Sequence, residues 1–164
     1  MTAETTISLP HCEAVSRALL ELLSTACGIS ADPSEEHGED VCKDGVIISV
    51  ISVMGDVEWS IFLGLPKMTA TSIAEKFAGF AIPFDSEDMG DAIGEVANIL
   101  AGCVKNILDK QGVRVEISLP SVFRADGLHI LKKRDSQSMR SCFTSVIGPL
   151  WTGVIAGNST GIMA

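Results

Sequence analysis

The stretch GDAIGEVANILAGCVKNILDK, residues 90–110, has the pattern of a long amphipathic helix around which the rest of the chain must fold. An α-helix turns by about 100° per residue, so side chains three, four and seven positions apart share a face. The aliphatic side chains gather on one face, which we expect to pack against a core: Ile93, Val96, Leu100, Val104 and Ile107. The opposite face is a row of polar or small residues about 60° wide. We call it the polar row, and it comprises Asp91, Glu95, Asn98 and Gly102.

The polar row and its surroundings contain residues that weaken a helix. Glycine inside a helix costs about 1 kcal/mol relative to alanine, and asparagine is also a poor helix former. This helix nevertheless contains Gly94, Asn98 and Gly102. Such residues occur where another molecule approaches the backbone closely, and they also occur on solvated faces that have no function. The pattern by itself leaves both interpretations open.

Two segments before the long helix also have helical patterns. In residues 11–28, aliphatic side chains recur at helical spacing and the run ends in Gly28. Residues 66–79 open with a proline and end in a glycine, which is typical of a short helix. Between these segments, residues 29–40 are acidic and contain proline and glycine without periodicity. We expect a loop or the start of an edge strand there.

The other apolar segments alternate as β-strands do. Residues 46–65 contain two β-branched and aromatic runs joined at Gly55–Asp56, a pair of residues that closes hairpins. Residues 113–120 alternate apolar and polar side chains and end in a proline, as a half-buried strand does. Three later runs are also strand-like: residues 127–131, 141–148 and 150–157. Because short turns join neighbouring runs, we expect an α+β fold, an antiparallel sheet with two long helices and a short helix packed on one face.

The composition predicts one soluble domain in the cytoplasm. The chain has 164 residues, about the length of a single domain, so we expect residues 1–164 to form one domain. No apolar run approaches the roughly 18 residues that a membrane span needs, and the first residues do not resemble a signal peptide. The formal net charge is -9 and no basic stripe is present, which argues against nucleic acid as a partner.

No set of residues predicts a metal or nucleotide site. The five cysteines have no CxxC spacing, so we expect buried, reduced thiols. Four residues near the N-terminus could be imagined as zinc ligands, but they lack the spacing of a zinc site: His11, Cys12, His37 and Cys42. His129 lies alone in an apolar run, and we assign it no role. Neither glycine-rich nucleotide-binding motif is present. We therefore expect no metal and no cofactor bound by this chain itself.

The acid and amide of the polar row carry a resemblance to a known family. The spacing Asp91-x-x-x-Glu95-x-x-Asn98-x-x-x-Gly102, on a long helix that leads into VEISLPSVF, resembles the signature of the CheC/CheX/FliY family of chemotaxis phosphatases. In length and element order the chain is most similar to CheX members, from about residue 7 to residue 156. The resemblance implies a CheC/CheX-like fold and a phosphatase that acts on the aspartyl phosphate of a CheY-like response regulator.

The resemblance also implies a role for each residue of the site. Asn98 would position the attacking water, a task that suits a carboxamide because it accepts and donates hydrogen bonds without titrating. Glu95 would dock the regulator's active-site lysine. Asp91, Gly94 and Gly102 would belong to the partner-binding surface, where small residues permit close approach. The regulator would supply the Mg²⁺, so this chain would need no cofactor of its own.

Two functions from different classes follow from the resemblance. The first is the phosphatase, and the second is a non-catalytic binding or assembly module, since the fold also occurs in the middle domain of the flagellar switch protein FliM. The presence of both the acid and the amide favours the phosphatase. Glu13 and Ser16 repeat the acid-x-x-polar spacing on the first helix, but serine reaches less far than asparagine, so we expect that helix to be inactive. By resemblance to CheX, and because exposed sheet edges invite pairing, we also expect a homodimer.

Overall fold

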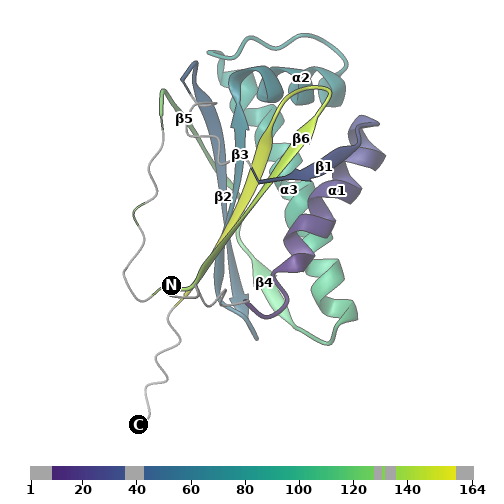
Figure 1. Cartoon of the computed structure of the whole chain (residues 1–164), viewed down its shortest axis with the longest axis vertical. Coiled ribbons are helices and arrows are strands. Elements are labelled where there is room, and N and C mark those ends of the chain that lie inside the picture. The colour runs from purple at the N-terminus through teal and green to yellow at the C-terminus, as the bar shows by residue number, and fades with distance from the viewer. Residues whose placement is uncertain (1–8, 36–42, 128–130, 132–135, 158–164) are drawn as a thin grey trace.

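The computed structural model describes residues 9–35, 43–127, 131 and 136–157. Within these residues, three helices cover one face of a seven-stranded sheet (Figure 1), which confirms the α+β fold that the sequence predicts. The elements follow the order α1 (Glu13–Cys27), β1 (Ala31–Ser34), β2 (Val46–Gly55), β3 (Trp59–Pro66), α2 (Lys67–Ala78), α3 (Glu87–Lys110), β4 (Val115–Ile117), β5 (Ser121–Ala125), β6 (Ser138–Ser145) and β7 (Leu150–Ala156).

The sheet is antiparallel throughout and has the order β1-β6-β7-β3-β2-β4, with β5 also paired to β2. The predicted hairpin lies inside the sheet, next to the β4 and β5 edge, where β2 and β3 pair from Val46↔Pro66 to Val53↔Trp59. Gly55 at the end of β2 has a φ of 141°, and a Cβ there would overlap the carbonyl oxygen of Arg114. Only glycine fits this position, because it has no Cβ and tolerates positive φ. The acidic segment after α1 supplies the edge strand β1.

The strand predicted over residues 113–120 differs from the structure. It splits into β4 and β5, both of which pair with β2. The register shifts between them, since β2 pairs Val53 with Ile117 but Val50 with Ser121. Three residues, 118–120, therefore lie opposite two residues of β2, and one extra residue on one strand of a pair defines a β-bulge. The proline within the bulge has no N–H for the ladder, so it interrupts the strand without ending it. The strand predicted at residues 127–131 falls largely outside the described residues.

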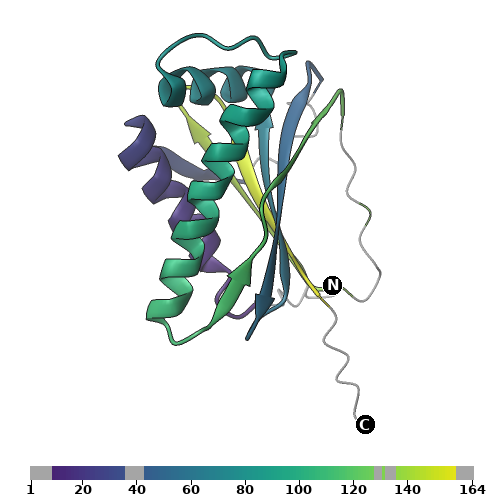
Figure 2. The same ribbon diagram turned by 180° about the vertical axis from the view of Figure 1, so that it is seen from behind.

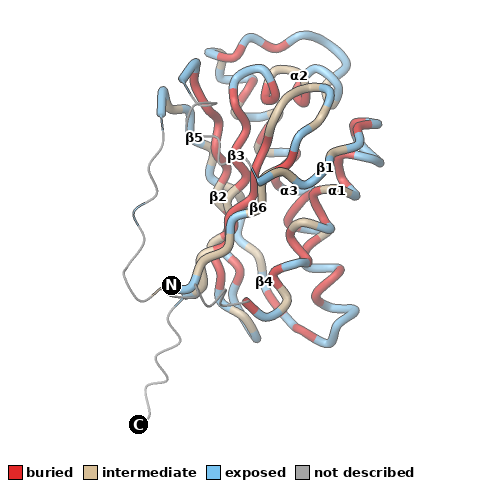
Figure 3. The backbone as a smooth tube through the Cα atoms, viewed as in Figure 1, coloured by how far each residue is buried: buried red, intermediate tan, exposed pale blue. Residues whose placement is uncertain are grey.

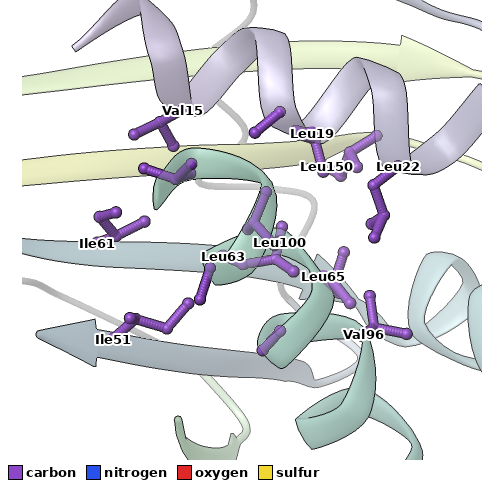
Figure 4. Close-up of a cluster of buried hydrophobic side chains, with 14 of the residues drawn as sticks. Val15, Leu19, Leu22, Ile51, Ile61, Leu63, Leu65, Val96, Leu100 and Leu150 are labelled. Atoms are coloured by element: carbon purple, nitrogen blue, oxygen red, sulfur yellow. The ribbon is translucent and has the colours of Figure 1, made fainter. Parts of the chain in front are cut away.

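The helices and the sheet share one large hydrophobic core. Alternate residues of β2, such as Ile47 and Ile51, face the helices, whereas Val46 and Ile48 belong to a small cluster with Trp151 on the other face. The aliphatic face of α3 is buried against α1, α2 and the sheet. Figure 4 shows the centre of this core, where side chains of two helices and of the sheet meet: Val15, Leu19 and Leu22 from α1, Val96 and Leu100 from α3, and Ile51, Ile61, Leu63, Leu65 and Leu150 from the strands.

The cysteines follow the sequence prediction only in part. All those within the described residues are free, and Cys12 and Cys27 are buried. Cys103 and Cys142 are only half-buried, because they lie at the margins of the packed faces. Burial raises the pKa of the Cys12 and Cys27 thiols above the ordinary value. Cys42 lies outside the described residues. Within the described part of the chain, no helix combines the length and the apolar character that crossing a membrane would require.

Candidate functional site on α3

The polar row lies on the outer face of α3. Asp91, Glu95, Asn98 and Gly102 are all exposed, while the residues between them on the other face belong to the core. Figure 3 shows this alternation of exposed and buried positions along the helices. Within the described residues, none of the three polar side chains makes a hydrogen bond or ion pair with the rest of the chain. Their carboxylates and amide are therefore available to another molecule.

The glycines of α3 are not required by the packing of this chain. A Cβ added to Gly102 would meet no atom within 4 Å. Gly94 is half-buried, and a Cβ there would lie 3.8 Å from Cγ2 of Val122 on β5, an ordinary van der Waals contact. Both positions have helical backbone, so neither needs glycine for its dihedral angles. The cost of glycine in a helix thus has no explanation inside the molecule.

The start of α3 is anchored by an arginine from the edge strand. Arg124 donates hydrogen bonds from Nη1 to the carbonyl oxygens of Phe84 and Ser86, at 3.1 and 3.3 Å. Its Nε lies 3.9 Å from Oδ1 of Asp85. These contacts hold the turn from which α3 begins against β5. Arg124 therefore pairs with the turn before α3, and among the described residues neither Asp91 nor Glu95 forms an ion pair.

The second half of α3 contacts the same edge of the sheet. Lys105 Nζ lies 3.4 Å from Oε2 of Glu116 on β4; about half of the Lys105 side chain and most of the Glu116 side chain are exposed. On its other side, towards α1, the polar row is bordered by two further residues of α3, the half-buried Cys103 and the partly exposed Ile99. The pKa of the Cys103 thiol is raised by burial and by the nearby Glu21 carboxylate of α1. The polar row is therefore bounded by α1 on one side and by β4 and β5 on the other.

The other residues that the sequence singled out do not join this site. His11, before α1, approaches the Oε1 of Gln111 with Nδ1 at 2.9 Å, beyond the far end of α3. His37, Cys42 and His129 lie outside the described residues. Glu13 is exposed on α1, whereas Ser16 is half-buried. Among the residues that the structure describes, no group of three or more His, Cys, Asp or Glu side chains could hold a metal ion.

The sequence analysis missed the neighbours that the edge strand brings to α3. Val122 and Arg124 lie on a strand that was expected to have ended at Pro120. The apolar residues on both sides of this proline were a signal for a strand that continues through a bulge.

Comparison with known proteins agrees with the fold and the helix. The family described as chemotaxis phosphatase CheX matches residues 47–144, and no curated protein matches the sequence. Among solved structures, the chemotaxis protein CheX from Vibrio vulnificus has a TM-score of 0.78 at 19% identity, covering 91% of this chain and 97% of that one. CheX from Desulfovibrio desulfuricans has a TM-score of 0.73 at 22% identity, covering 91% and 100%.

A third similar structure contains a partner. The CheX-CheY-BeF₃-Mg²⁺ complex from Borrelia burgdorferi has a TM-score of 0.69 at 21% identity, covering 91% of this chain and 98% of that one. At these identities the structures are similar in fold. The family match covers more than half of the 164 residues and includes all of α3. The chain therefore belongs to the CheX family of chemotaxis phosphatases.

Proposed function

We propose that this protein hydrolyses the aspartyl phosphate of a CheY-like response regulator and that the polar row of α3 is the surface that meets the regulator. The observation that carries this proposal is the pairing of an exposed acid and an exposed amide, Glu95 and Asn98, on a helix whose other face is buried. The backbone of such a helix is held by the core beneath it, so the points from which Glu95 and Asn98 project are fixed before a partner arrives.

Asn98 is the residue that we assign to the chemistry. In the reaction, a water oxygen attacks phosphorus, the bond from phosphorus to the aspartate oxygen breaks, and inorganic phosphate leaves while a water proton passes to solvent. The transition state of such a transfer is loose and in line, so catalysis consists mainly of positioning and charge stabilisation. The carboxamide of Asn98 can accept a hydrogen bond from the water and hold it in line with the breaking bond.

Glu95 and Asp91 are assigned to recognition of the regulator. Glu95 lies about one turn before Asn98, so its carboxylate can pair with a lysine beside the phosphorylated aspartate while Asn98 reaches the phosphoryl group. Asp91 extends the negative row by one more turn and would contribute to steering and orientation. Gly94 and Gly102 would let the regulator approach the helix backbone.

The Mg²⁺ of the reaction is assigned to the regulator. The described part of this chain contains no cluster of carboxylates or of cysteine and histidine that could hold a metal. The Borrelia burgdorferi complex, which contains CheY, BeF₃ and Mg²⁺, is consistent with this division.

The decay of phosphorylated receiver domains tests the proposal. A panel of receiver domains would be phosphorylated with a small-molecule donor in the presence of Mg²⁺, and the loss of phosphate would be followed with and without the protein. We expect faster decay for at least one of them. If the protein binds a phosphorylated receiver domain without accelerating its decay, it is a non-catalytic module instead.

A further inference from the structure

The bulge between β4 and β5 is built by specific hydrogen bonds. The backbone N–H of Ser118 donates to the carbonyl oxygen of Ser52 at 2.9 Å. The Ser118 hydroxyl accepts from the Ser52 N–H at 2.9 Å and donates to the carbonyl oxygen of Leu119 at 3.0 Å. The following Pro120 fixes its own φ near -65°. Residues 118–120 thus have a defined conformation, and bulges of this kind redirect a side chain out of the regular alternation of a strand.

The side chain at the centre of this bulge is a leucine that faces water. Leu119 is 82% exposed, although leucine is among the residues most often buried in proteins. A single exposed leucine has no meaning by itself, but its place beside the polar row can be determined from two contacts.

These two contacts show that α3 and the edge strand run antiparallel, side by side. Lys105 meets Glu116, and Gly94 lies beside Val122. Figure 2 shows the same arrangement, with the chain leaving the end of α3 and returning along it as β4 and β5. The bulge therefore lies beside α3, between the levels of Lys105 and Gly94.

Asn98 lies at the level of the bulge and on the same flank of the helix. It is four residues beyond Gly94, which is about 6 Å along the helix axis. Pro120 and Leu119 precede Val122 by two and three residues, which is about 7 and 10 Å along the strand. Around the helix, Gly94, Asn98 and Lys105 fall within about 40° of one another, so Asn98 is on the side that the edge strand borders.

We infer that Leu119 is a second contact for the receiver domain on which Asn98 acts, and that it sets affinity for that domain without taking part in the chemistry. This inference rests on the proposed function. The partner would present an apolar patch next to its phosphorylation site. Ile99, which is 38% exposed, borders the polar row on the other side, so a docked partner would have apolar contacts on both flanks of the reacting groups. Such an apolar border excludes water from the polar centre of an interface.

The bulge favours a receiver domain over a second copy of this chain as the occupant. Pairing between two sheet edges needs a continuous row of free backbone groups. Here Pro120 has no N–H, and the Leu119 carbonyl already accepts from Ser118. Leu119 lies instead at the level of Asn98, on the flank of α3 where the receiver domain is proposed to bind.

The test compares Leu119→Ser with Val146→Ser. Val146 lies in the turn between β6 and β7 and is 92% exposed, so its substitution removes a similar exposed apolar group away from α3. The assay is steady-state dephosphorylation of the receiver domain that the wild-type protein dephosphorylates fastest, together with binding of that domain loaded with beryllofluoride and Mg²⁺. For Leu119→Ser we expect about a tenfold rise in both KM and Kd with kcat within twofold of wild type, and for Val146→Ser no change. Leu119→Ala should give a smaller rise.

Each other outcome overturns the inference in a recognisable way. An unchanged KM for Leu119→Ser in an active wild-type background would remove Leu119 from the interface and leave the proposed function standing. A fall in kcat at unchanged KM would place Leu119 in the chemistry. A change in oligomeric state by light scattering, with KM unchanged, would assign Leu119 to contact between copies. A wild-type protein that neither binds nor dephosphorylates any receiver domain would overturn both this inference and the proposed function.

Discussion

Two residues one turn apart on α3, Glu95 and Asn98, differ in what they can do for the same partner. Both are exposed, and neither has a described partner in the free protein. The carboxylate carries a charge that acts over a distance, whereas the neutral amide acts only through directed hydrogen bonds. Substitutions at the two positions are therefore expected to change different kinetic constants.

Replacing Asn98 with alanine should lower kcat by about 10²-fold and leave KM nearly unchanged, because the attacking water loses its positioning group. The free energy of unfolding should change by no more than about 0.5 kcal/mol, since the side chain is exposed. Single-turnover decay of a phosphorylated receiver domain and urea denaturation measure the two quantities. Asn106→Ala is a matched control, because Asn106 is exposed on the same helix outside the polar row. Normal hydrolysis by Asn98→Ala would favour the non-catalytic module.

Replacing Glu95 with alanine should mainly raise KM, because the ion pair with the regulator's lysine is lost. Some loss of kcat is also expected, since that lysine faces the phosphoryl group. The difference in KM between wild type and Glu95→Ala should shrink as salt is raised from 0.05 to about 0.5 M, because salt screens exposed charges. Glu75→Ala, on the exposed side of α2, provides a control that removes the same charge elsewhere. A rise in KM that does not depend on salt would contradict the ion pair. An unfolded Glu95→Ala variant would show that Glu95 is needed for folding.

At the scale of the element, α3 combines a face that stabilises the fold with a row that weakens the helix. The apolar face buries large aliphatic side chains against two other helices and the sheet. That burial stabilises α3 enough to tolerate glycines at positions where the packing does not require them. The helix can therefore present an open backbone to a partner without losing its own structure.

This division predicts that Gly94→Ala and Gly102→Ala make the protein more stable and less active. Each added methyl group should increase the free energy of unfolding by about 0.4 to 1 kcal/mol, because alanine is the better helix former. The same methyl groups would lie against the docked regulator and should raise KM. Gly90→Ala is the matched control, since a Cβ there meets nothing within 4 Å and lies two turns from Asn98. If both variants gain stability and keep full activity, the glycines belong to a solvated face without function.

At the scale of the whole molecule, the two edges of the sheet limit how copies can associate. One edge is β1, which has four residues and contains Pro33, and the other is β4 with β5, interrupted by Pro120. Prolines and bulges at sheet edges prevent long continuous pairing between molecules. Within the described residues, each edge therefore offers only a short uninterrupted row of backbone groups for pairing.

We nevertheless expect a homodimer, from the resemblance to CheX and because short lengths of both edges stay unpaired in the described sheet. Light scattering across a range of concentrations measures this directly. A dimer should be present at high micromolar protein and should persist in Leu119→Ser. A monomer at these concentrations would contradict the prediction.

The local features of this fold were determined by the sequence alone. Residues close in the chain decide where a helix ends and which side of it is apolar, so α1 ends before Gly28 and α3 has two faces, as the periodicity predicts. The hairpin of β2 and β3 also follows from adjacent residues, because Gly55 permits the tight turn between them. The acid and amide of the polar row could be recognised for the same reason, since their spacing lies within one helix.

Only the tertiary structure decided what lies beside that row. The pairing of both β4 and β5 with β2 joins residues at least 60 positions apart, and a pattern of adjacent residues contains no information about such a register. The prediction that the strand ends at Pro120 was wrong because pairing with β2 resumes after the bulge. That long-range pairing brings Leu119 to the level of Asn98 and places Val122 against Gly94. The reacting groups of the candidate site thus all belong to one helix. The residues that border them, on β4 and β5, reach the site only through contacts that form when the sheet packs against α3.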